Sequence, residues 1–283
     1  MKTVLITGCS SGIGFATALS FAKQGFHVIA TMRNLDKSKR LQNKAQAEHL
    51  NIDIRQLDVT DESSTQSLID NIINDYKNID ILINNAGSGF LGTLEQTSLS
   101  QAQEIMDVNF FGVWRVTKAI LPHMRKNKSG HIISITSVGG IIGQPFNDAY
   151  CAAKFAIEGM MESLAPVVNR FGIQVSLIEP GPVNSEFITS TLSKSLDLNL
   201  DLQNDYKEML EAYTEATQNV FAQFAESPEE IAAFILAVAT SKPASFRYQS
   251  SELSKTIANL KFVDPTGNQA VAFSGSRLPE IIE

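Results

Sequence analysis

A tyrosine and a lysine, Tyr150 and Lys154, stand four residues apart in a segment whose composition predicts a helix over 147–170. Residues at this spacing lie on the same face of a helix, so the phenol and the ammonium group would be neighbours. A tyrosine with its ordinary pKa of about 10 is a poor proton shuttle at neutral pH. A nearby positive charge stabilises the phenolate. We therefore expect Tyr150 to exchange protons and Lys154 to lower its pKa.

A glycine-rich loop near the N-terminus is the second candidate for chemistry. It follows an apolar run, precedes an apolar helical pattern, and reads Thr7-Gly8-Cys9-Ser10-Ser11-Gly12-Ile13-Gly14. A strand, glycine loop and helix in this order bring bare backbone and helix N–H groups close to a pyrophosphate. The spacing differs from the commoner Gly-x-Gly-x-x-Gly, and a purely structural turn is the alternative. If the loop binds a dinucleotide, the contacts come from Gly8, Ser10, Ser11, Gly12, Ile13 and Gly14.

The end of the second predicted strand bears on which dinucleotide this would be. It reads Thr31-Met32-Arg33-Asn34 and contains no carboxylate for a ribose 2′-hydroxyl. Arg33 instead offers the planar donor fork that suits a 2′-phosphate, which favours NADP(H) over NAD(H). Two alternatives stay open. In the first, the strand extends further and Asp36 binds the ribose 2′-hydroxyl, which would allow NAD(H) to bind. In the second, Arg33 is an ordinary surface charge with no role in coenzyme binding.

Short apolar runs alternate with longer amphipathic stretches, as expected when crossover helices join parallel strands. The predicted strands are 3–7, 26–31, 52–57, 79–83, 130–136 and 172–178. Their nearly continuous hydrophobicity predicts that both faces of the sheet are covered. The fold class is therefore α/β, a doubly wound Rossmann-type parallel sheet of about seven strands. A seventh strand at 245–249 is favoured over a rival at 269–273.

No linker interrupts the first 185 residues, so we expect a single domain over 1–283. The segment 186–227 breaks the alternation with spaced leucines and then apolar residues at a helical period. It follows the carboxyl end of a strand, where open α/β sheets bind ligands, so a helical substrate lid is one interpretation and an ordinary core helix the other. Ser227-Pro228-Glu229-Glu230 is a capping box that predicts a helix from there to about Thr240.

Composition excludes several classes of function. The 283 residues are 43% hydrophobic and 19% charged, which is typical of a globular protein. The net charge of −7 disfavours nucleic acid as a partner. Two cysteines, Cys9 and Cys151, cannot form a disulfide framework, and neither they nor the histidines have metal-ligand spacing. No signal peptide and no apolar run of roughly 20 residues is present, so we expect no membrane span and a cytoplasmic location.

Further motifs accompany the glycine loop, Tyr150 and Lys154. They are Asn84-Asn85-Ala86-Gly87, Asp107-Val108-Asn109, Ser137 thirteen residues before Tyr150, and Pro180-Gly181. In this order, over residues 1 to about 185, they resemble the short-chain dehydrogenase/reductase family. The resemblance implies hydride transfer between a nicotinamide coenzyme and a small-molecule carbonyl or alcohol. Tyr150 would be the acid/base, Ser137 would hydrogen-bond the substrate oxygen, Lys154 would bind the nicotinamide ribose, and Asn109 would hold a water.

The same resemblance assigns coenzyme contacts beyond the glycine loop. Asp58 and Val59 would contact the adenine, and Asn85, Ala86 and Gly87 would line the coenzyme site. The stretch from Pro180 to Ser185 would hold the nicotinamide carboxamide through Pro180, Gly181, Val183 and Ser185. The family often has threonine at the last of these positions. Turn or sheet-end structure is the alternative role for each.

Three stretches, 134–140, 145–151 and 179–183, resemble the hydroxysteroid and retinol dehydrogenase branch of the family. That branch implies an apolar steroid-, retinoid- or lipid-like substrate. One alternative is a reductase of small polar or acyl-carrier substrates. Another is a non-catalytic NADP(H)-binding sensor or scaffold, which usually lacks the tyrosine, lysine or serine. Most members of the family pair through segments equivalent to 99–127 and 147–171, so a homodimer or homotetramer is expected.

Overall fold

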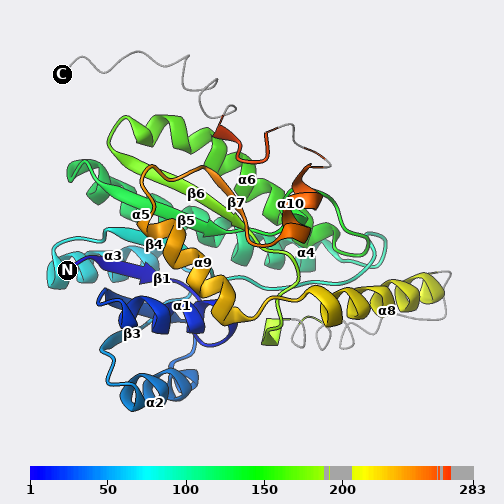
Figure 1. Cartoon of the computed structure of the whole chain (residues 1–283), viewed down its shortest axis with the longest axis horizontal. Coiled ribbons are helices and arrows are strands. Elements are labelled where there is room, and N and C mark those ends of the chain that lie inside the picture. Colours follow the sequence, from blue (N-terminus) through cyan, green and yellow to red (C-terminus); the bar gives the residue numbers. More distant parts are fainter. Residues whose placement is uncertain (188–190, 192–205, 260, 262–263, 269–283) are drawn as a thin grey trace.

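The strands of this chain form one parallel sheet. The computed structural model describes residues 1–187, 191, 206–259, 261 and 264–268. In these ranges seven strands lie in the order β3-β2-β1-β4-β5-β6-β7 (Figure 1). They are β1 (Thr3–Ile6), β2 (His27–Met32), β3 (Ile52–Gln56), β4 (Ile81–Asn84), β5 (Gly130–Ile135), β6 (Ile173–Glu179) and β7 (Arg247–Gln249). The predicted fold class is confirmed.

Helices cover both faces of the sheet. The α-helices are α1 (Gly12–Lys23), α2 (Lys39–Ala47), α3 (Glu62–Tyr76), α4 (Leu99–Met106), α5 (Gly112–Lys126), α6 (Asp148–Asn169), α8 (Lys207–Phe224), α9 (Pro228–Thr240) and α10 (Glu252–Asn259). Short 3₁₀ turns are η1 (Leu35–Ser38) and η3 (Val138–Gly140), and a π-helical turn is η2 (Asp107–Phe111). Helices α3, α5 and α6 share one core with the sheet, while α1 and α9 share the other.

The two cores explain why the strands lack a polar alternation. Along β1, Leu5 packs into the core with α3, α5 and α6, whereas its neighbours Val4 and Ile6 pack into the core with α1 and α9. All three side chains are fully buried. Since successive side chains of a strand point to opposite faces, a sheet covered on both sides needs apolar residues at every position.

The strand order places the ends of β1 and β4 side by side. The chain runs from β1 outward to β2 and β3, then returns so that β4 pairs with the other edge of β1. Val4 aligns with Ile81 and Ile6 with Ile83, so the two strands end at the same level. In open α/β sheets this reversal point opens the crevice in which ligands bind.

Most predicted elements agree with the structure to within two residues at their ends. The seventh strand lies inside the favoured 245–249 and pairs with β6, whereas the rival 269–273 lies outside the described residues. The segment 99–127 is less regular than expected, because η2 separates α4 from α5. Among the described residues, no helix combines the length and hydrophobicity needed to cross a membrane.

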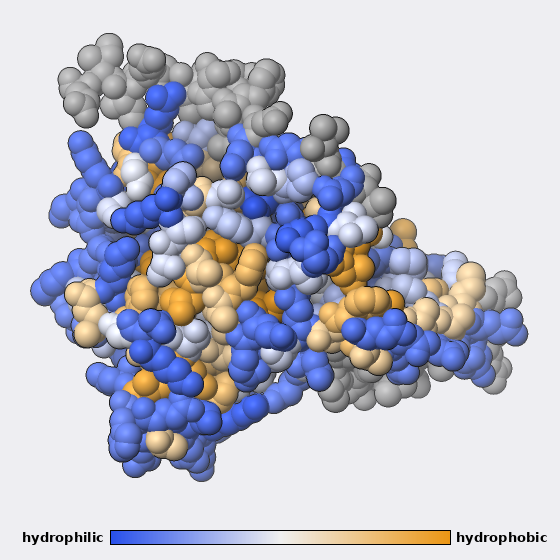
Figure 2. All heavy atoms as spheres, viewed as in Figure 1, coloured by the Kyte–Doolittle hydropathy of each residue, from blue (hydrophilic) through white to orange (hydrophobic). Residues whose placement is uncertain are grey.

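Helix α8 projects away from the sheet (Figure 1) and none of its residues is buried. Tyr206, which precedes it, donates a hydrogen bond to Glu95 at 2.8 Å, and Tyr213 accepts one from Asn147 at 3.1 Å. Figure 2 shows apolar and polar side chains mixed along this projection. The interpretation of this helix as an ordinary core helix is therefore wrong. Most of the leucine-rich part of 186–227 lies outside the described residues.

The predicted start of α9 is confirmed by its hydrogen bonds. The Ser227 hydroxyl accepts from the Glu230 N–H at 3.2 Å, and the Glu230 carboxylate accepts from the Ser227 N–H at 2.7 Å, with Pro228 at the start of the helix. Two N–H groups without helical partners are satisfied in this way. The cap fixes where α9 begins, beside the N-terminal end of α1.

Removing the cap should destabilise the protein without touching its core. We expect Ser227→Ala to lower the free energy of unfolding by about 1 kcal/mol, because the Glu230 N–H loses its acceptor. Urea denaturation followed by circular dichroism measures this. Glu229→Gln, in the same exposed first turn, is the control and should change stability by less than about 0.5 kcal/mol. Equal losses in the two variants would show that the cap contributes nothing.

Candidate active site

Three glycines of the loop after β1 are required by its conformation. Gly8 and Gly12 have φ of +74° and +55°, in the left-handed region that glycine adopts without penalty. A Cβ on Gly8 would lie 2.8 Å from the Cα of Ala86, and one on Gly14 would overlap the Gly8 carbonyl and the Asn85 amide. The loop is therefore a cradle of bare backbone, and this shape fits a dinucleotide pyrophosphate.

Hydrogen bonds join this loop to the turn after β4. The Thr7 hydroxyl accepts from the N–H groups of Asn85 and Ala86, both at 3.0 Å. The Asn85 side chain donates to the carbonyls of Thr7 at 2.8 Å and Gly8 at 3.1 Å. Buried Asn84 donates to Thr117 and Ser134. The structure thus places Asn85 and Ala86 against the glycine loop, as expected, and Asn84 across β4 and β5.

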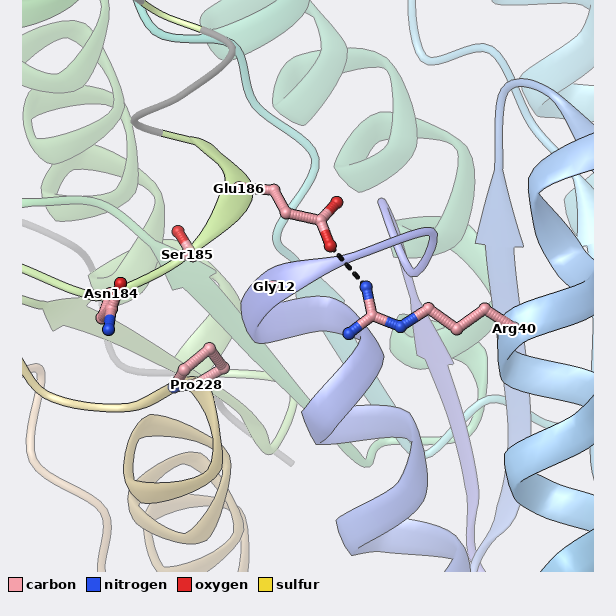
Figure 3. Close-up of a pocket in the computed structure, with 6 residues that line it drawn as sticks. All are labelled: Gly12, Arg40, Asn184, Ser185, Glu186 and Pro228. Atoms are coloured by element: carbon pink, nitrogen blue, oxygen red, sulfur yellow. Dashed lines mark hydrogen bonds and ion pairs between the residues drawn. The ribbon is translucent and has the colours of Figure 1, made fainter.

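A cavity of about 310 Å³ opens beside the glycine loop (Figure 3). It is lined by Gly12, Arg40, Asn184, Ser185, Glu186 and Pro228. Gly12 and Pro228 begin α1 and α9, so two helix N-termini face it and both favour negative charge. Arg40 and Glu186 form an ion pair across the cavity (Figure 3).

The sequence analysis assigned Gly12 and Ser185 to the coenzyme site and included Asn184 only within the stretch from Pro180 to Ser185. It did not assign Arg40, Glu186 or Pro228 to the site. Asn184 and Glu186 flank Ser185 in the chain, which was the one available signal. Arg40 comes from α2, and nothing in its local sequence indicates that it reaches the segment after β6. Its guanidinium also lies 4.7 Å from the centre of the Phe15 ring.

The opposite end of the crevice is formed by the residues after β2 and β3. Strand β2 ends at Met32, so exposed Arg33 is the first residue beyond it, with its carbonyl accepting from Gln56 at 3.0 Å. Asp36 lies in η1, where its N–H donates to Asn34 at 2.8 Å. The longer strand that the Asp36 alternative requires is therefore absent. Asp58 accepts two hydrogen bonds from Thr60 within its own turn, and Val59 packs against Gly112.

Ser137 and Tyr150 lie together at the carboxyl end of β5. Ser137 follows this strand closely and accepts from the Gly139 N–H at 3.0 Å, while Tyr150 stands in the first turn of α6. The two side chains are neighbours, since a Cβ on Gly139 would lie 3.4 Å from both Ser137 Oγ and Tyr150 Cε1, and Ser137 lowers the pKa of Tyr150. Burial has the larger effect and raises that pKa to about 12. The phenol is consequently protonated at neutral pH.

Lys154 is buried one turn further along α6. Its Nζ donates to the Ile135 carbonyl at 2.9 Å and lies 5.7 Å from the centre of the Tyr150 ring. Burial lowers the pKa of Lys154 to about 8, and the nearby Glu158 opposes this shift. The pKa of Tyr150 is nevertheless raised rather than lowered in this structure, because desolvation of the phenol outweighs the favourable interactions; the role of Lys154 in stabilising the phenolate stays a prediction.

Asn109 occupies the π-helical turn η2, which the sequence pattern did not predict. Its side chain accepts from the Ser88 N–H at 3.0 Å and donates to the carbonyls of Ser88 at 2.9 Å and Ile105 at 3.0 Å. Only the last of these bonds is internal to the helix. A Cβ on Gly87 would lie 2.8 Å from Asn109 Oδ1 and 3.9 Å from Lys154 Nζ. Asn109 and Lys154 thus both lie close to Gly87. The water that the family resemblance assigns to Asn109 stays a prediction.

The remaining predicted contacts follow β6. The Pro180 carbonyl accepts from the Val138 N–H at 3.0 Å, which ties this segment to η3. Gly181 lies against Ser254, Val183 forms a bridge with Glu226, and a Cβ on Gly12 would lie 3.4 Å from Ser185. Phe187, which the sequence analysis did not select, has its ring 5.8 Å from the ring of Tyr150. The segment after β6 therefore connects the glycine loop with Tyr150.

Comparisons with known proteins agree with this architecture. The family model for short chain dehydrogenase matches residues 2–195. Retinol dehydrogenase 8 of Bos taurus is 38% identical over 283 residues, covering 96% of this chain and 89% of the relative. The 17-beta-hydroxysteroid dehydrogenase type 1 of Homo sapiens is 37% identical over 277 residues, covering 95% and 83%.

A solved structure of a short-chain dehydrogenase from Streptomyces avermitilis superposes with a TM-score of 0.75, at 28% identity, over 91% of each chain. The family model and these relatives cover the glycine loop, the turn after β4 and the Ser137, Tyr150 and Lys154 cluster together. The chain therefore belongs to the short-chain dehydrogenase/reductase family and is an oxidoreductase that acts on CH–OH groups.

Proposed function

We propose that this protein is an NADP(H)-dependent oxidoreductase that interconverts a carbonyl and a primary or secondary alcohol on an apolar substrate, with Tyr150 as the acid/base. The observation that carries the proposal is the pair of neighbouring side chains Ser137 and Tyr150, with Lys154 one turn away, at the end of the crevice formed by the glycine loop. A sensor or scaffold would have no need of this arrangement.

The side chains divide the chemistry between them. The nicotinamide coenzyme supplies the hydride when it is bound. Tyr150 donates its proton to the substrate oxygen, and the Ser137 hydroxyl hydrogen-bonds the same oxygen while negative charge develops on it. Because burial raises the pKa of Tyr150 to about 12, the phenol is held as a proton donor at neutral pH.

Selection of NADP(H) over NAD(H) is assigned to Arg33. It is the first residue beyond β2, its side chain is exposed, and the competing Asp36 is turned into η1. A guanidinium at this position would suit the 2′-phosphate of NADP(H), because its planar donor fork can bind phosphate oxygens. Residues Gly8 to Gly14, with Asn85 to Gly87 and Pro180 to Ser185, would hold the rest of the coenzyme.

An apolar substrate is supported by the aromatic side chains around Tyr150. Phe187 contacts the Tyr150 ring, and Phe146 lies 5.4 Å from the Tyr213 ring of α8. We assign residues 186–227 as a substrate lid within a single domain over 1–283. The relatives named as retinol and hydroxysteroid dehydrogenases support a steroid-, retinoid- or lipid-like substrate.

Assembly into a homodimer or homotetramer is part of the proposal. Phe111 and Trp114 are each nearly half exposed and form, with Phe110, an aromatic surface on η2 and α5. Exposed apolar surface of this kind is typical of a protein interface. It lies within the segment 99–127 through which members of the family pair.

Replacing Tyr150 tests the catalytic assignment. We expect Tyr150→Phe to lower turnover at least about a hundredfold while coenzyme binding is kept, because the proton donor is lost. Oxidation of NADPH is followed by absorbance with keto-steroids, retinal, medium-chain aldehydes and small polar ketones. Tyr76→Phe, on the distant α3, is the matched control and should retain full turnover.

Each result of this assay discriminates between the alternatives. Unchanged turnover in Tyr150→Phe would remove Tyr150 from its role. Activity confined to small polar carbonyls would discard the apolar substrate. Coenzyme binding without turnover of any compound would favour the sensor or scaffold.

Replacing Arg33 tests the coenzyme preference. We expect Arg33→Ala to raise the Kd for NADPH roughly ten- to a hundredfold, the loss typical of a charged hydrogen bond, with little change for NADH. Titration calorimetry with both coenzymes measures this. Arg40→Ala is the matched comparison, since Arg40 lies at the pyrophosphate end and its loss should affect both coenzymes alike. Equal losses for NADPH and NADH in Arg33→Ala would contradict the assignment.

A further inference from the structure

Behind the site lies a buried ionic cluster that the reaction does not directly use. It joins Glu158 of α6, Glu179 at the end of β6 and Arg247 of β7, whose side chains are 8%, 0% and 4% exposed. Arg247 Nε donates to Glu158 Oε2 at 3.0 Å, and its Nη2 donates to Glu162 at 2.5 Å. Charges this deep in a protein are costly unless they are paired, so the cluster needs an explanation.

The cluster contains more acid than base. Three carboxyl groups, Glu158, Glu162 and Glu179, surround the single guanidinium of Arg247, and Lys154 faces Glu158 from the preceding turn of α6. Thr136 and Gln249 are the neutral partners. Of the three acids only Glu162 reaches solvent, with 33% of its side chain exposed. If both buried acids were ionised, Glu158 Oε2 and Glu179 Oε1 would bring two negative charges to within 3.0 and 3.2 Å of the same Arg247 Nε and repel each other.

Two buried carboxyl oxygen atoms of the cluster indicate where a proton could be shared. Glu158 Oε1 and Glu179 Oε1 are buried, and neither accepts a hydrogen bond among the described residues, although Glu179 Oε1 lies 3.2 Å from Arg247 Nε in an ion pair. The two carboxyl groups are neighbours, because both approach the same Arg247 Nε. Glu179 Oε2 already accepts from Gln249 at 2.6 Å, and Glu158 Oε2 from Arg247. One proton on Glu179 Oε1, donated to Glu158 Oε1, satisfies both atoms.

The cluster lies next to three segments that carry the active site. Thr136, whose hydroxyl lowers the pKa of Glu158, precedes Ser137, and Glu179 precedes Pro180. Glu158 itself stands one helical turn after Lys154. A Cβ on Gly140 would lie 3.2 Å both from Glu158 Cγ and from the Lys154 backbone, so η3 rests between these two residues.

We propose that Glu158 and Glu179 share one proton at neutral pH, with Arg247 holding Glu158 as the anion, and that Glu158 is a positioning residue that keeps Lys154 charged. Burial raises the pKa of both acids, that of Glu179 to about 8, and the hydrogen bond that Arg247 Nε donates to Glu158 opposes this rise at Glu158. The charge on Glu158 opposes the lowering of the Lys154 pKa by burial. The catalytic part of this inference rests on the proposed function, whereas the shared proton does not.

The shared proton can be tested without coenzyme or substrate. Infrared spectroscopy of the free protein at pH 7 should show the carbonyl stretch of a buried protonated carboxyl group. Glu179→Gln should remove this band, and Glu162→Gln, which alters another partner of Arg247, should keep it. A wild-type spectrum without the band, or a band that survives in Glu179→Gln, would overturn the proposal even if the protein showed no turnover.

The effect on Lys154 is tested by the pH profile of alcohol oxidation. In Glu158→Gln the anion beside Lys154 is lost, so Lys154 loses its proton at lower pH and stabilises the Tyr150 phenolate less. We expect the pH of half-maximal rate to rise by about one unit. Glu179→Gln mimics the protonated acid and should keep the wild-type profile at neutral pH, as should Glu162→Gln.

A lower rate with an unshifted profile in Glu158→Gln would show a structural role only and overturn the positioning role. If Glu158→Gln fails to fold by circular dichroism, Arg247→Met provides the second variant. It leaves Glu158 without its cation, so Glu158 takes up the proton more readily and the same upward shift is expected. An unshifted profile in Arg247→Met would overturn the positioning role as well.

Discussion

The hydrogen bonds between Thr7 and the turn after β4 hold together the two strand ends on which the site depends. Because β1 and β4 pair in register and end at the same level, their following loops must meet, and only glycine at positions 8 and 14 lets the backbones approach so closely. The bare loop and the first turn of α1 then face the crevice. On the far side of β4, β5 ends at the same edge and brings Ser137 within reach of Tyr150.

Burial is the dominant electrostatic effect at this edge, and it acts in opposite directions on the two titrating residues of α6. It raises the pKa of Tyr150 and lowers that of Lys154, because in each case the charged form loses its hydration. Tyr150 is therefore a neutral phenol, and the ammonium group of Lys154 loses its proton at a lower pH than that of an exposed lysine. The negative charge of Glu158 opposes the lowering of the Lys154 pKa. Because Glu158 is buried, water screens its charge less than it would screen the charge of an exposed residue.

The sequence predicted the parts of the structure that depend on local chemistry. Apolar strands, the glycine loop, the capping box of α9 and the spacing of Ser137, Tyr150 and Lys154 are each readable within a few residues of chain. The π-helical turn at Asn109 was not predicted, because its stabilising bonds to Ser88 come from a distant loop. The direction of the Tyr150 pKa shift was wrong for a related reason. Spacing identifies a neighbouring lysine but does not reveal how deeply the phenol is buried.

The contacts across the site were likewise beyond prediction from one sequence. Arg40 and Glu186 are 146 residues apart, and Arg247 and Glu158 are 89 apart, so only the folded sheet brings them together. The same holds for α8, whose apolar period predicted either a core helix or a lid. A core helix stabilises itself by burying that face, yet no residue of α8 is buried. Its side-chain contacts to the rest of the protein include the hydrogen bonds of Tyr206, just before the helix, and of Tyr213 within it. A helix held so weakly costs little free energy to move, and this is the property that a lid over a bulky apolar substrate requires.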